Sequence, residues 1–324
     1  MNVSISGHAP SGWDSFLASN PYGTFFQTGL YADYARKEAG LKPFFLRAEE
    51  NSAVKGQLLL FKGSRYQSGL ANLPFSSLTT RVARSLFPSF SWAYGPVAES
   101  ASAANALLEK AREVSKGRMV GSCHPLQPFV LDSSQFGLRE KKWATFLIDL
   151  NEAEDVLWSK VDKAARKLVT RTMEQVEIKQ VEHEEEYRQY HSILTENRKR
   201  SKVIPYKYST LLWKIWRESG TGGIFIAVEK TSGKVIAGLG ISCFNGYVNE
   251  WGAGTSNYAF ENHVYAQDAI KWAIVKWAKE KGFRYFDLTG VNPSPQSEKE
   301  RGIFRFKEKW GGKLKEYSMF SRST

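Results

Sequence analysis

The chain has 324 residues and a formal net charge of +12, and 42% of its residues are apolar. That length accommodates two domains with separate cores, and the composition is that of a globular protein rather than a disordered one. It contains no run of the roughly 18 apolar residues that a membrane-spanning helix needs, its first residues lack the pattern of a signal peptide, and Cys123 and Cys243 offer no disulfide framework. We therefore expect a cytoplasmic protein. The positive charge indicates an anionic partner or simply the composition of the host's proteins.

The first half of the chain predicts an alternation of helices and strands. We expect helices over residues 11–20 and 101–116, and strands over 43–48, 55–61, 118–123 and 143–150. After the last strand, Asn151 is followed three residues later by Glu154. This arrangement is typical of a capping box and predicts a helix that starts there.

The second half predicts a denser version of the same order. We expect helices over 160–174, 184–200, 209–219, 259–281 and 298–310, and strands over 176–180, 223–229, 234–244, 247–253 and 284–288. Helices around a run of antiparallel strands indicate a mixed α/β layer. Two similar α/β domains are therefore expected, with a boundary near residues 145–152.

The last of these helices carries a cation on an apolar stripe. Ile303, Phe306, Lys307 and Trp310 fall at i, i+3, i+4 and i+7, the spacing of one buried helix face. An ammonium on such a face is costly unless an anionic group meets it, so Lys307 is a candidate for handling negative charge. The alternative is that its stem lies along the core and its ammonium reaches water.

Two further segments are strongly basic. Arg166 and Lys167 lie within one turn of Lys163, and this helix face suits either phosphate groups or plain solvation. The run Arg198-Lys199-Arg200 lies near Tyr206 and Tyr208, an interleaving of cations and aromatic rings that favours a binding surface.

Other candidates are single residues with a structural alternative. Asp287 ends a predicted strand and either takes a proton or caps the following loop. His124 is either a general base or a hydrogen-bonded structural residue. Gly252 and Gly254 permit a β-bulge or a plain turn. The five histidines show no ligand spacing, so we expect no metal site.

Six segments, taken in this order, resemble the Fem family of aminoacyltransferases: NPYGTFFQT, WAYGPV, LWSKVDKAARKLVTRTMEQV, EWGAGTS, FDLTGVNP and FRFKEKWGG. The resemblance implies an α/β fold of two tandem GNAT-like (acetyltransferase-like) domains, each a mixed, mostly antiparallel sheet flanked by helices, without the coiled-coil arm of some members. Residues 1–148 would form the first domain, to which a strand over 316–324 returns, and residues 149–315 the second, which carries the site.

The resemblance also implies transfer of an aminoacyl or acyl group to an amine of a cell-wall (peptidoglycan) or other cell-envelope precursor. Aminoacyl-tRNA is favoured over acyl-CoA as the activated donor, and no cofactor or metal is expected. The implied partners are a small-molecule, lipid-linked or nucleotide-linked acceptor and the acceptor end of a tRNA, and we expect a monomer.

Residue by residue, Lys307 matches the family's lysine that neutralises charge on the donor, Phe306 the aromatic residue before it, and Tyr208 a tyrosine that contacts substrate. The chain departs from the pattern at Ile204, where FemX has an arginine, and at Trp251, where a tyrosine is usual. His124-Pro125 replaces an Asp-Pro pair. Tyr258 and Tyr265 are either hydroxyl donors that orient the amine or core rings. The candidates are therefore Lys307, Tyr208 and Asp287 for catalysis, and Phe306, Trp251, Tyr258, Tyr265, His124, Arg166 and Lys167 for substrate binding.

Two other functions remain open at this stage. An acyl-CoA-dependent N-acetyltransferase would share the fold, but it would use a Gly-rich turn before a helix to hold pyrophosphate, and the segment GAGTSNYAFENHVYAQ lacks that pattern. A non-catalytic module that binds anions or nucleic acid would predict that Lys307 faces solvent.

Overall fold

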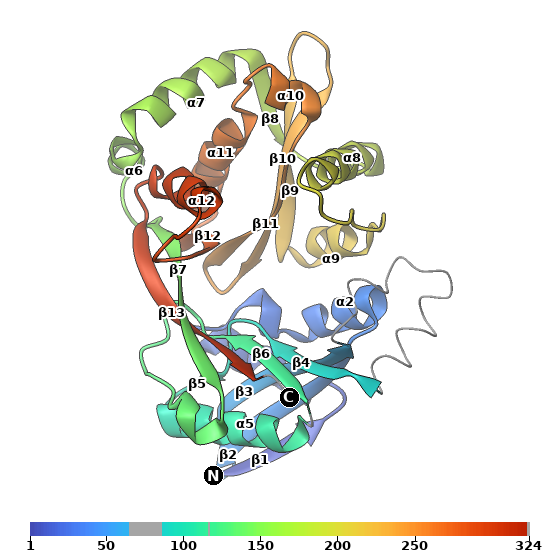
Figure 1. Cartoon of the computed structure of the whole chain (residues 1–324), viewed down its shortest axis with the longest axis vertical. Coiled ribbons are helices and arrows are strands. Elements are labelled where there is room, and N and C mark those ends of the chain that lie inside the picture. Colours follow the sequence, from blue (N-terminus) through green and yellow to red (C-terminus); the bar gives the residue numbers. More distant parts are fainter. Residues whose placement is uncertain (65–85, 116, 323–324) are drawn as a thin grey trace. The chain divides into compact units, whose positions relative to one another are not determined.

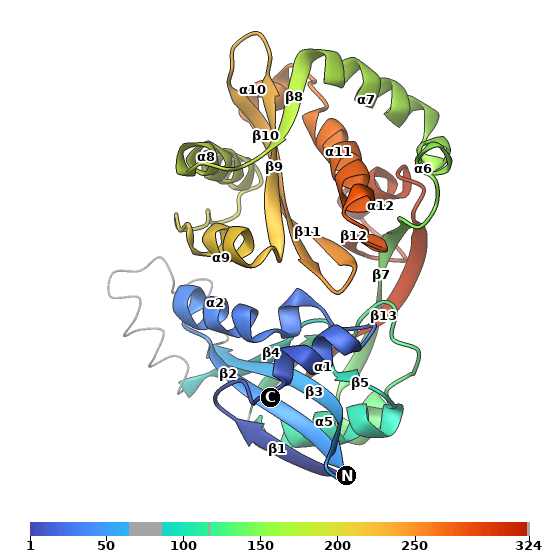
Figure 2. The same ribbon diagram turned by 180° about the vertical axis from the view of Figure 1, so that it is seen from behind.

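The computed structural model describes residues 1–64, 86–115 and 117–322, which form two compact units (Figures 1 and 2). Unit 1 lies within residues 1–144 and 315–324, and unit 2 is Thr145–Leu314. Strands β7 (Arg139–Asp149) and β13 (Lys313–Arg322) lead the chain from one unit into the other and back. The last two residues of the strand expected over 316–324 lie outside the described residues.

Unit 1 is a mixed sheet with helices packed on it. Its sheet has the order β1-β2-β3-β4-β6-β13. Strands β4 and β6 are parallel, and β1 with β2, β2 with β3, β3 with β4, and β6 with β13 pair antiparallel. The elements are β1 (Asn2–Ser6), α1 (Trp13–Ser19), η1 (Phe25–Gln27), α2 (Gly29–Ala39), β2 (Lys42–Glu50), β3 (Ala53–Ser64), β4 (Pro88–Trp92), β5 (Val97–Ala98), α5 (Ala101–Val114), β6 (Arg118–Ser122) and η2 (Ser133–Phe136).

The core of unit 1 lies between its sheet and α5. Small and branched side chains of α5, among them Ala104 and Leu107, are fully buried against Leu46 and Leu58 of the sheet. Phe320 of β13 stacks on Trp92, with ring centroids 6.4 Å apart. The last strand of the chain therefore contributes a buried side chain to the core of the first unit.

Unit 2 has the order β7-β12-β11-β10-β9-β8 in its sheet. The four strands β8 to β11 pair antiparallel, and β11 pairs parallel with β12. The elements are α6 (Glu154–Lys160), α7 (Lys163–Gln175), β8 (Val176–Gln180), α8 (Glu184–Arg200), α9 (Leu211–Ser219), β9 (Gly222–Glu229), β10 (Val235–Phe244), β11 (Tyr247–Thr255), α10 (Asn257–Glu261), α11 (Ala266–Glu280), β12 (Tyr285–Val291) and α12 (Glu298–Glu308).

Helices cover both faces of this sheet. Figure 1 shows α8 and α9 on one face and α7, α11 and α12 on the other, and Figure 2 shows the same division from behind. Strand β10 is buried over most of its length, as a central strand between two helical layers should be. The longest helix of unit 2, α8, has 17 residues, so this unit contains no long coiled-coil arm. Among the described helices, none has both the length and the apolar composition needed to cross a bilayer.

Three details of unit 2 differ from the sequence predictions. The prediction of a capping box at Asn151 is wrong, because α6 begins at Glu154 after Ala153. The Asn151 side-chain amide instead donates a hydrogen bond to Asp149. The helix expected over 259–281 is two helices, α10 and α11, separated where His263 takes a φ of +54°. A residue in that left-handed conformation cannot continue a right-handed helix.

The third difference concerns the last helix. Its expected apolar stripe is not a core face, because Ile303 and Phe306 are exposed, and Phe304 instead packs against Phe146 with ring centroids 5.0 Å apart. Trp310, just past the end of α12, is the member of the stripe that is fully buried. The inner side of α12 is therefore lined by Phe304 and Lys307.

Candidate active site

Strands β11 and β12 pair over a short stretch only. The parallel register joins Tyr247 to Tyr285 and ends at Asn249 and Asp287, although β11 continues to Thr255 and β12 to Val291. Among the described residues, β11 and β12 do not pair with each other beyond Asn249 and Asp287. Backbone groups that do not pair in a sheet are available for other hydrogen bonds.

Asp287 stands where the pairing ends and is completely buried. Its carboxylate accepts hydrogen bonds from the Tyr247 hydroxyl at 2.7 Å, the Asn249 amide at 3.2 Å, the Thr289 backbone N–H at 2.7 Å and the Thr145 hydroxyl. Burial raises the pKa of this carboxyl, and the hydrogen bonds from Thr145, Tyr247 and Thr289 oppose that shift. Its bond to Thr289 N–H, two residues on, fits the capping alternative, and its burial keeps it away from any dissolved substrate.

Thr289 connects Asp287 to Lys307 of α12 through hydrogen bonds. The residue has a φ of +61°, a left-handed conformation that is costly for a β-branched side chain and is held here by the bond from its N–H to Asp287. Its carbonyl and hydroxyl oxygens both face the ammonium of Lys307, at 3.2 and 3.3 Å, and the Gly290 carbonyl lies at 3.3 Å. Asp287 therefore positions the oxygens that surround Lys307.

Lys307 is half-buried on α12, and its hydrogen bonds within the described residues all go to neutral oxygens. Burial lowers the pKa of Lys307 to about 8, and the charge of Asp287 partly opposes that shift. Within the described residues, no carboxylate lies within 4.0 Å of its Nζ, although two neighbouring lysines do have such partners. Lys309 pairs with Asp268 at 2.6 Å.

Lys271 is the other paired lysine, and sequence reasoning missed it. It lies on α11, its side chain is 2% exposed, and it forms an ion pair with Glu250 of β11. Its ammonium lies 5.6 to 6.0 Å from the ring centroids of Phe286, Phe306 and Trp310. Burial, with the nearby charges of two other lysines, lowers its pKa well below the ordinary value.

A signal for Lys271 was present in the sequence. Ile274, Val275 and Ala278 follow it at i+3, i+4 and i+7, and all are buried. This is the spacing that identified Lys307, applied to a second helix. Glu250 is the first residue of β11 beyond the parallel pairing, so the ion pair lies where the two strands separate.

Of the two alternatives for Gly252, a β-bulge or a plain turn, the structure shows the bulge. The pairing of β10 with β11 skips Gly252 between Trp251 and Ala253, and Gly252 has a φ of +71°. The Tyr190 hydroxyl of α8 donates to the Gly252 carbonyl at 2.5 Å. The Trp251 ring packs edge-on against Trp216, with centroids 5.5 Å apart.

The structure does not bring Tyr208 to Lys307. Tyr208 lies between α8 and α9 in the chain and packs on Tyr187 of α8, with ring centroids 5.8 Å apart. Figure 1 shows α8 and α9 on the face of the sheet opposite α12. Tyr208 is exposed, and its hydroxyl lies 3.3 Å from Glu184. Phe306, by contrast, is next to Lys307 and contributes its ring to the surroundings of Lys271. His124 belongs to unit 1, is buried, and accepts a hydrogen bond from Leu126 N–H; burial lowers its pKa to about 3, which favours the structural alternative.

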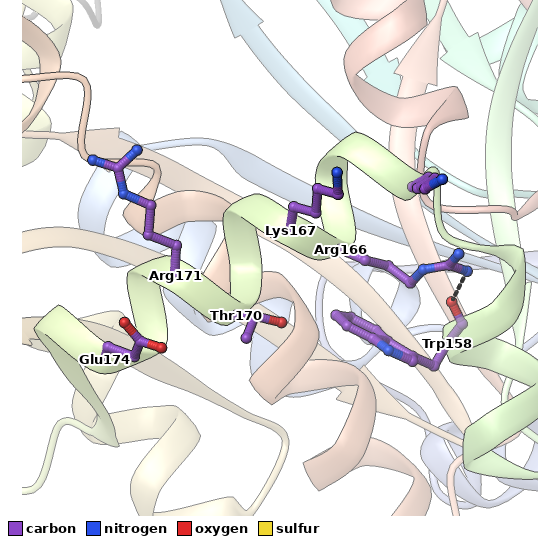
Figure 3. Close-up of a pocket in the computed structure, with 7 residues that line it drawn as sticks. Trp158, Arg166, Lys167, Thr170, Arg171 and Glu174 are labelled. Carbon is purple, nitrogen blue, oxygen red and sulfur yellow. Dashed lines mark hydrogen bonds between the residues drawn. The ribbon is translucent and has the colours of Figure 1, made fainter.

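The remaining candidates line two cavities along α7 whose lining does not include Lys307. The first, of ≈ 360 Å³, is lined by Arg166 and Lys167 (Figure 3), and Arg166 is held there by bonds to the carbonyls of Trp158 and Ser159. The second, of ≈ 470 Å³, is lined by Tyr258 and Tyr265. In the described residues, no group of three or more His, Cys, Asp or Glu side chains is placed to hold a metal ion.

Unit 2 has the features of a GNAT-like fold: a mixed sheet, a bulge in β11, and the parallel strands β11 and β12, which separate beyond Asn249 and Asp287. The chain has two α/β units in tandem. No protein-family model and no curated protein sequence matches the chain. The crystal structure of FemX matches with a TM-score of 0.70 and 15% identity, over 98% of this chain and 97% of that one. L-PGS from Bacillus licheniformis matches with a TM-score of 0.59 and 14% identity, over 98% and 93%.

A tandem GNAT protein from the clavulanic acid biosynthesis pathway also matches, with a TM-score of 0.52 and 12% identity over 99% of this chain and 98% of that one. At these identities the likeness is one of fold. The predicted fold class, mixed α/β with tandem GNAT-like units, is confirmed, and so is the resemblance to the Fem fold.

Proposed function

We propose that this protein is a Fem-type N-acyltransferase that moves an aminoacyl or acyl group from an activated donor to an amine of a cell-envelope precursor. The observation that carries the proposal is the ammonium of Lys307. Lys271 and Lys309 have carboxylate partners, whereas Lys307 meets only neutral oxygens in the described part of the chain. A half-buried cation without a counter-ion is suited to receive negative charge from a ligand.

Amide formation creates such a charge. The nitrogen of a neutral acceptor amine attacks the ester carbonyl of the donor, an N–C bond forms, and the carbonyl oxygen becomes negative. The C–O bond to the donor then breaks, the amine nitrogen loses a proton, and the leaving oxygen gains one. Lys307 has a pKa of about 8, so it is charged at neutral pH and can still exchange a proton. It is therefore suited both to stabilise the oxyanion and to protonate the leaving oxygen.

We further propose that the donor is an aminoacyl-tRNA whose acceptor end lies along α7. Lys163, Lys167 and Arg171 line the same cavity at i, i+4 and i+8, so they form a stripe with a rise of about 6 Å between neighbours. Figure 3 shows Lys167 and Arg171 pointing away from the helix on this side. Regularly spaced cations beside an aromatic ring, that of Trp158, suit the phosphates and bases of a single strand.

Acyl-CoA is the weaker donor candidate. In a CoA-dependent enzyme the turn before α11 would hold pyrophosphate on backbone N–H groups. Here the short helix α10 occupies that turn, and the cavity beside it is lined by the carboxylates Glu174 and Glu229 as well as by Arg171 and Lys230. Such a balanced lining offers a pyrophosphate no net attraction.

The test is a donor-consumption assay with purified protein. Charged tRNA and acetyl-CoA are incubated separately with candidate amines, and we expect the charged tRNA to be consumed. Lys307→Ala should lower turnover by about 100-fold or more, the usual effect of removing one oxyanion donor. Lys299→Ala, an exposed lysine of the same helix, is the matched control and should not change turnover. Consumption of neither donor by folded protein would instead support the anion-binding module.

A further inference from the structure

The segment between α8 and α9 exposes three apolar side chains together. Val203 is 45% exposed, Ile204 50% and Tyr206 55%, within four consecutive residues. We call these three residues the apolar tip. Single exposed apolar residues are ordinary on a protein surface, but a contiguous group indicates a surface that meets something other than water.

The apolar tip is held in a defined conformation by the end of α8. Lys202 has a φ of +55°, and the Val203 N–H donates to the Arg198 carbonyl at 2.9 Å, which closes the helix. The Arg198 side chain then donates to the Ile204 carbonyl at 2.6 Å and places its guanidinium 3.9 Å from the centroid of the Tyr206 ring. The backbone is therefore fixed so that the apolar side chains face outward.

The chain segment around the apolar tip is basic between Glu196 and Glu218, although Glu184 of α8 lies 3.3 Å from the neighbouring Tyr208 hydroxyl. From Asn197 to Arg217 the chain has no Asp or Glu and seven basic residues: Arg198, Lys199, Arg200, Lys202, Lys207, Lys214 and Arg217. Lys199, Lys202 and Lys207 are exposed. Arg200 lies 4.5 Å from the centroid of the Phe260 ring of α10, which is 59% exposed.

We propose that the apolar tip and its lysines dock the protein onto the surface of an anionic lipid bilayer. Lysines flanking apolar and aromatic side chains match the two layers of such a surface, because the cations meet the headgroups while Val203 and Ile204 enter the acyl boundary. A second copy of the chain is the wrong partner, since like charges would face each other. Nucleic acid would use the cations and Tyr206, but aliphatic side chains neither stack on bases nor bind phosphates.

This docking goes beyond acyl transfer and does not depend on it. Binding to a membrane surface is measured without any donor or acceptor, so failure of the docking proposal and failure of the proposed function are separate results. If both hold, the acceptor amine would be carried by a lipid in the membrane to which the protein is docked.

The experiment is co-sedimentation of the full chain with lipid vesicles. Vesicles of phosphatidylcholine alone are compared with vesicles of equal parts phosphatidylcholine and phosphatidylglycerol, and we expect binding to the anionic vesicles only, weakening as salt is raised. Each basic residue near an anionic surface strengthens binding about fivefold, so Lys199→Gln with Lys202→Gln and Lys207→Gln should weaken it on the order of 100-fold. The matched control removes three cations from α7: Lys163→Gln, Lys167→Gln and Arg171→Gln.

The apolar contribution is tested separately. Val203→Ser with Ile204→Ser should weaken vesicle binding at least about tenfold. Val130→Ser with Val156→Ser removes two exposed apolar side chains elsewhere and should leave binding as in the wild type. Circular dichroism and thermal melting confirm that each variant is folded.

Three results would overturn the proposal: no binding of the wild type to anionic vesicles, equal losses in the α7 control, or full binding by the serine variant of the apolar tip. A fourth would assign the surface to nucleic acid. In that case the glutamine variant would lose binding to a single-stranded oligonucleotide while keeping its binding to vesicles.

Discussion

Removing Lys271 should destabilise unit 2 far more than its single charge suggests. The lysine is 2% exposed and its partner Glu250 is 11% exposed, so Lys271→Met leaves a carboxylate that is nearly buried and has lost its counter-ion. Breaking a buried ion pair in this way costs about 3–5 kcal/mol. Methionine has a stem of similar length and a polarizable sulfur that suits the aromatic surroundings of the Lys271 ammonium, which lies 5.6 to 6.0 Å from the ring centroids of Phe286, Phe306 and Trp310. Little of the loss should therefore come from packing.

The double variant separates charge from shape. Glu250→Leu in the Lys271→Met background removes the carboxylate that has lost its counter-ion. Apolar pairs of similar volume can replace buried ion pairs with little or no loss of folding free energy. We therefore expect the free energy of unfolding of the double variant to lie within about 1 kcal/mol of the wild-type value. The difference between the single and double variants measures the interaction between the two side chains.

Urea unfolding followed by tryptophan fluorescence is the appropriate assay. Three of the ten tryptophans, Trp13, Trp92 and Trp143, lie in unit 1, and the other seven lie in unit 2, so the signal reports mainly on unit 2. Lys299→Met, at an exposed position, is the control and should change stability by less than about 0.5 kcal/mol. A double variant as unstable as Lys271→Met alone would refute the reasoning, because the loss would then be one of packing.

Three further predictions follow from the same geometry. If the Lys307 ammonium is required, turnover should fall as pH rises through about 8, where that group loses its proton, and a pH–rate profile measures this. Asp287→Asn removes a charge that raises the pKa of Lys307, so the alkaline limb of that profile should move to lower pH; an unmoved limb would contradict the coupling. Gly252→Ala should cost about 1–3 kcal/mol, because it strains a φ of +71° and places a methyl group 2.8 Å from the Tyr190 hydroxyl. Gly220→Ala, at a φ of +68° with no atom within 4 Å, carries the backbone strain alone and should cost less in the same urea titration.

The secondary structure was largely predictable because it follows from local patterns. Strand β8 was predicted with its full bounds, and α8 likewise, since periodicity and acidic and basic helix ends mark them. The break between α10 and α11 was not predictable, because Ala259 and Ala266 continue the same apolar periodicity across it. The left-handed turn at His263 carries no composition signal, as histidine adopts it only occasionally.

The site was predictable only in part, for a physical reason. Lys307 was identifiable because a cation on an otherwise apolar stripe is locally anomalous. Its surroundings were not, because they depend on where β11 and β12 stop pairing. Glu250 and Asp287 are both acidic residues on strands, yet one lies beyond the last parallel pair and the other at it. That difference is set by the tertiary structure and leaves no mark on either residue's neighbours in sequence.

The charges at this place explain why Lys307 and not its neighbours is available to a ligand. Two of the three lysines are neutralised by carboxylates of their own, Lys271 by Glu250 and Lys309 by Asp268. Asp287 is nearby, but it accepts hydrogen bonds from the neutral donors Tyr247 and Asn249. It is separated from Lys307 by Thr289, whose N–H donates to Asp287 and whose carbonyl accepts from Lys307. Thr289 therefore holds the ammonium without removing its charge. A direct ion pair would have left no charge for an arriving anion to meet.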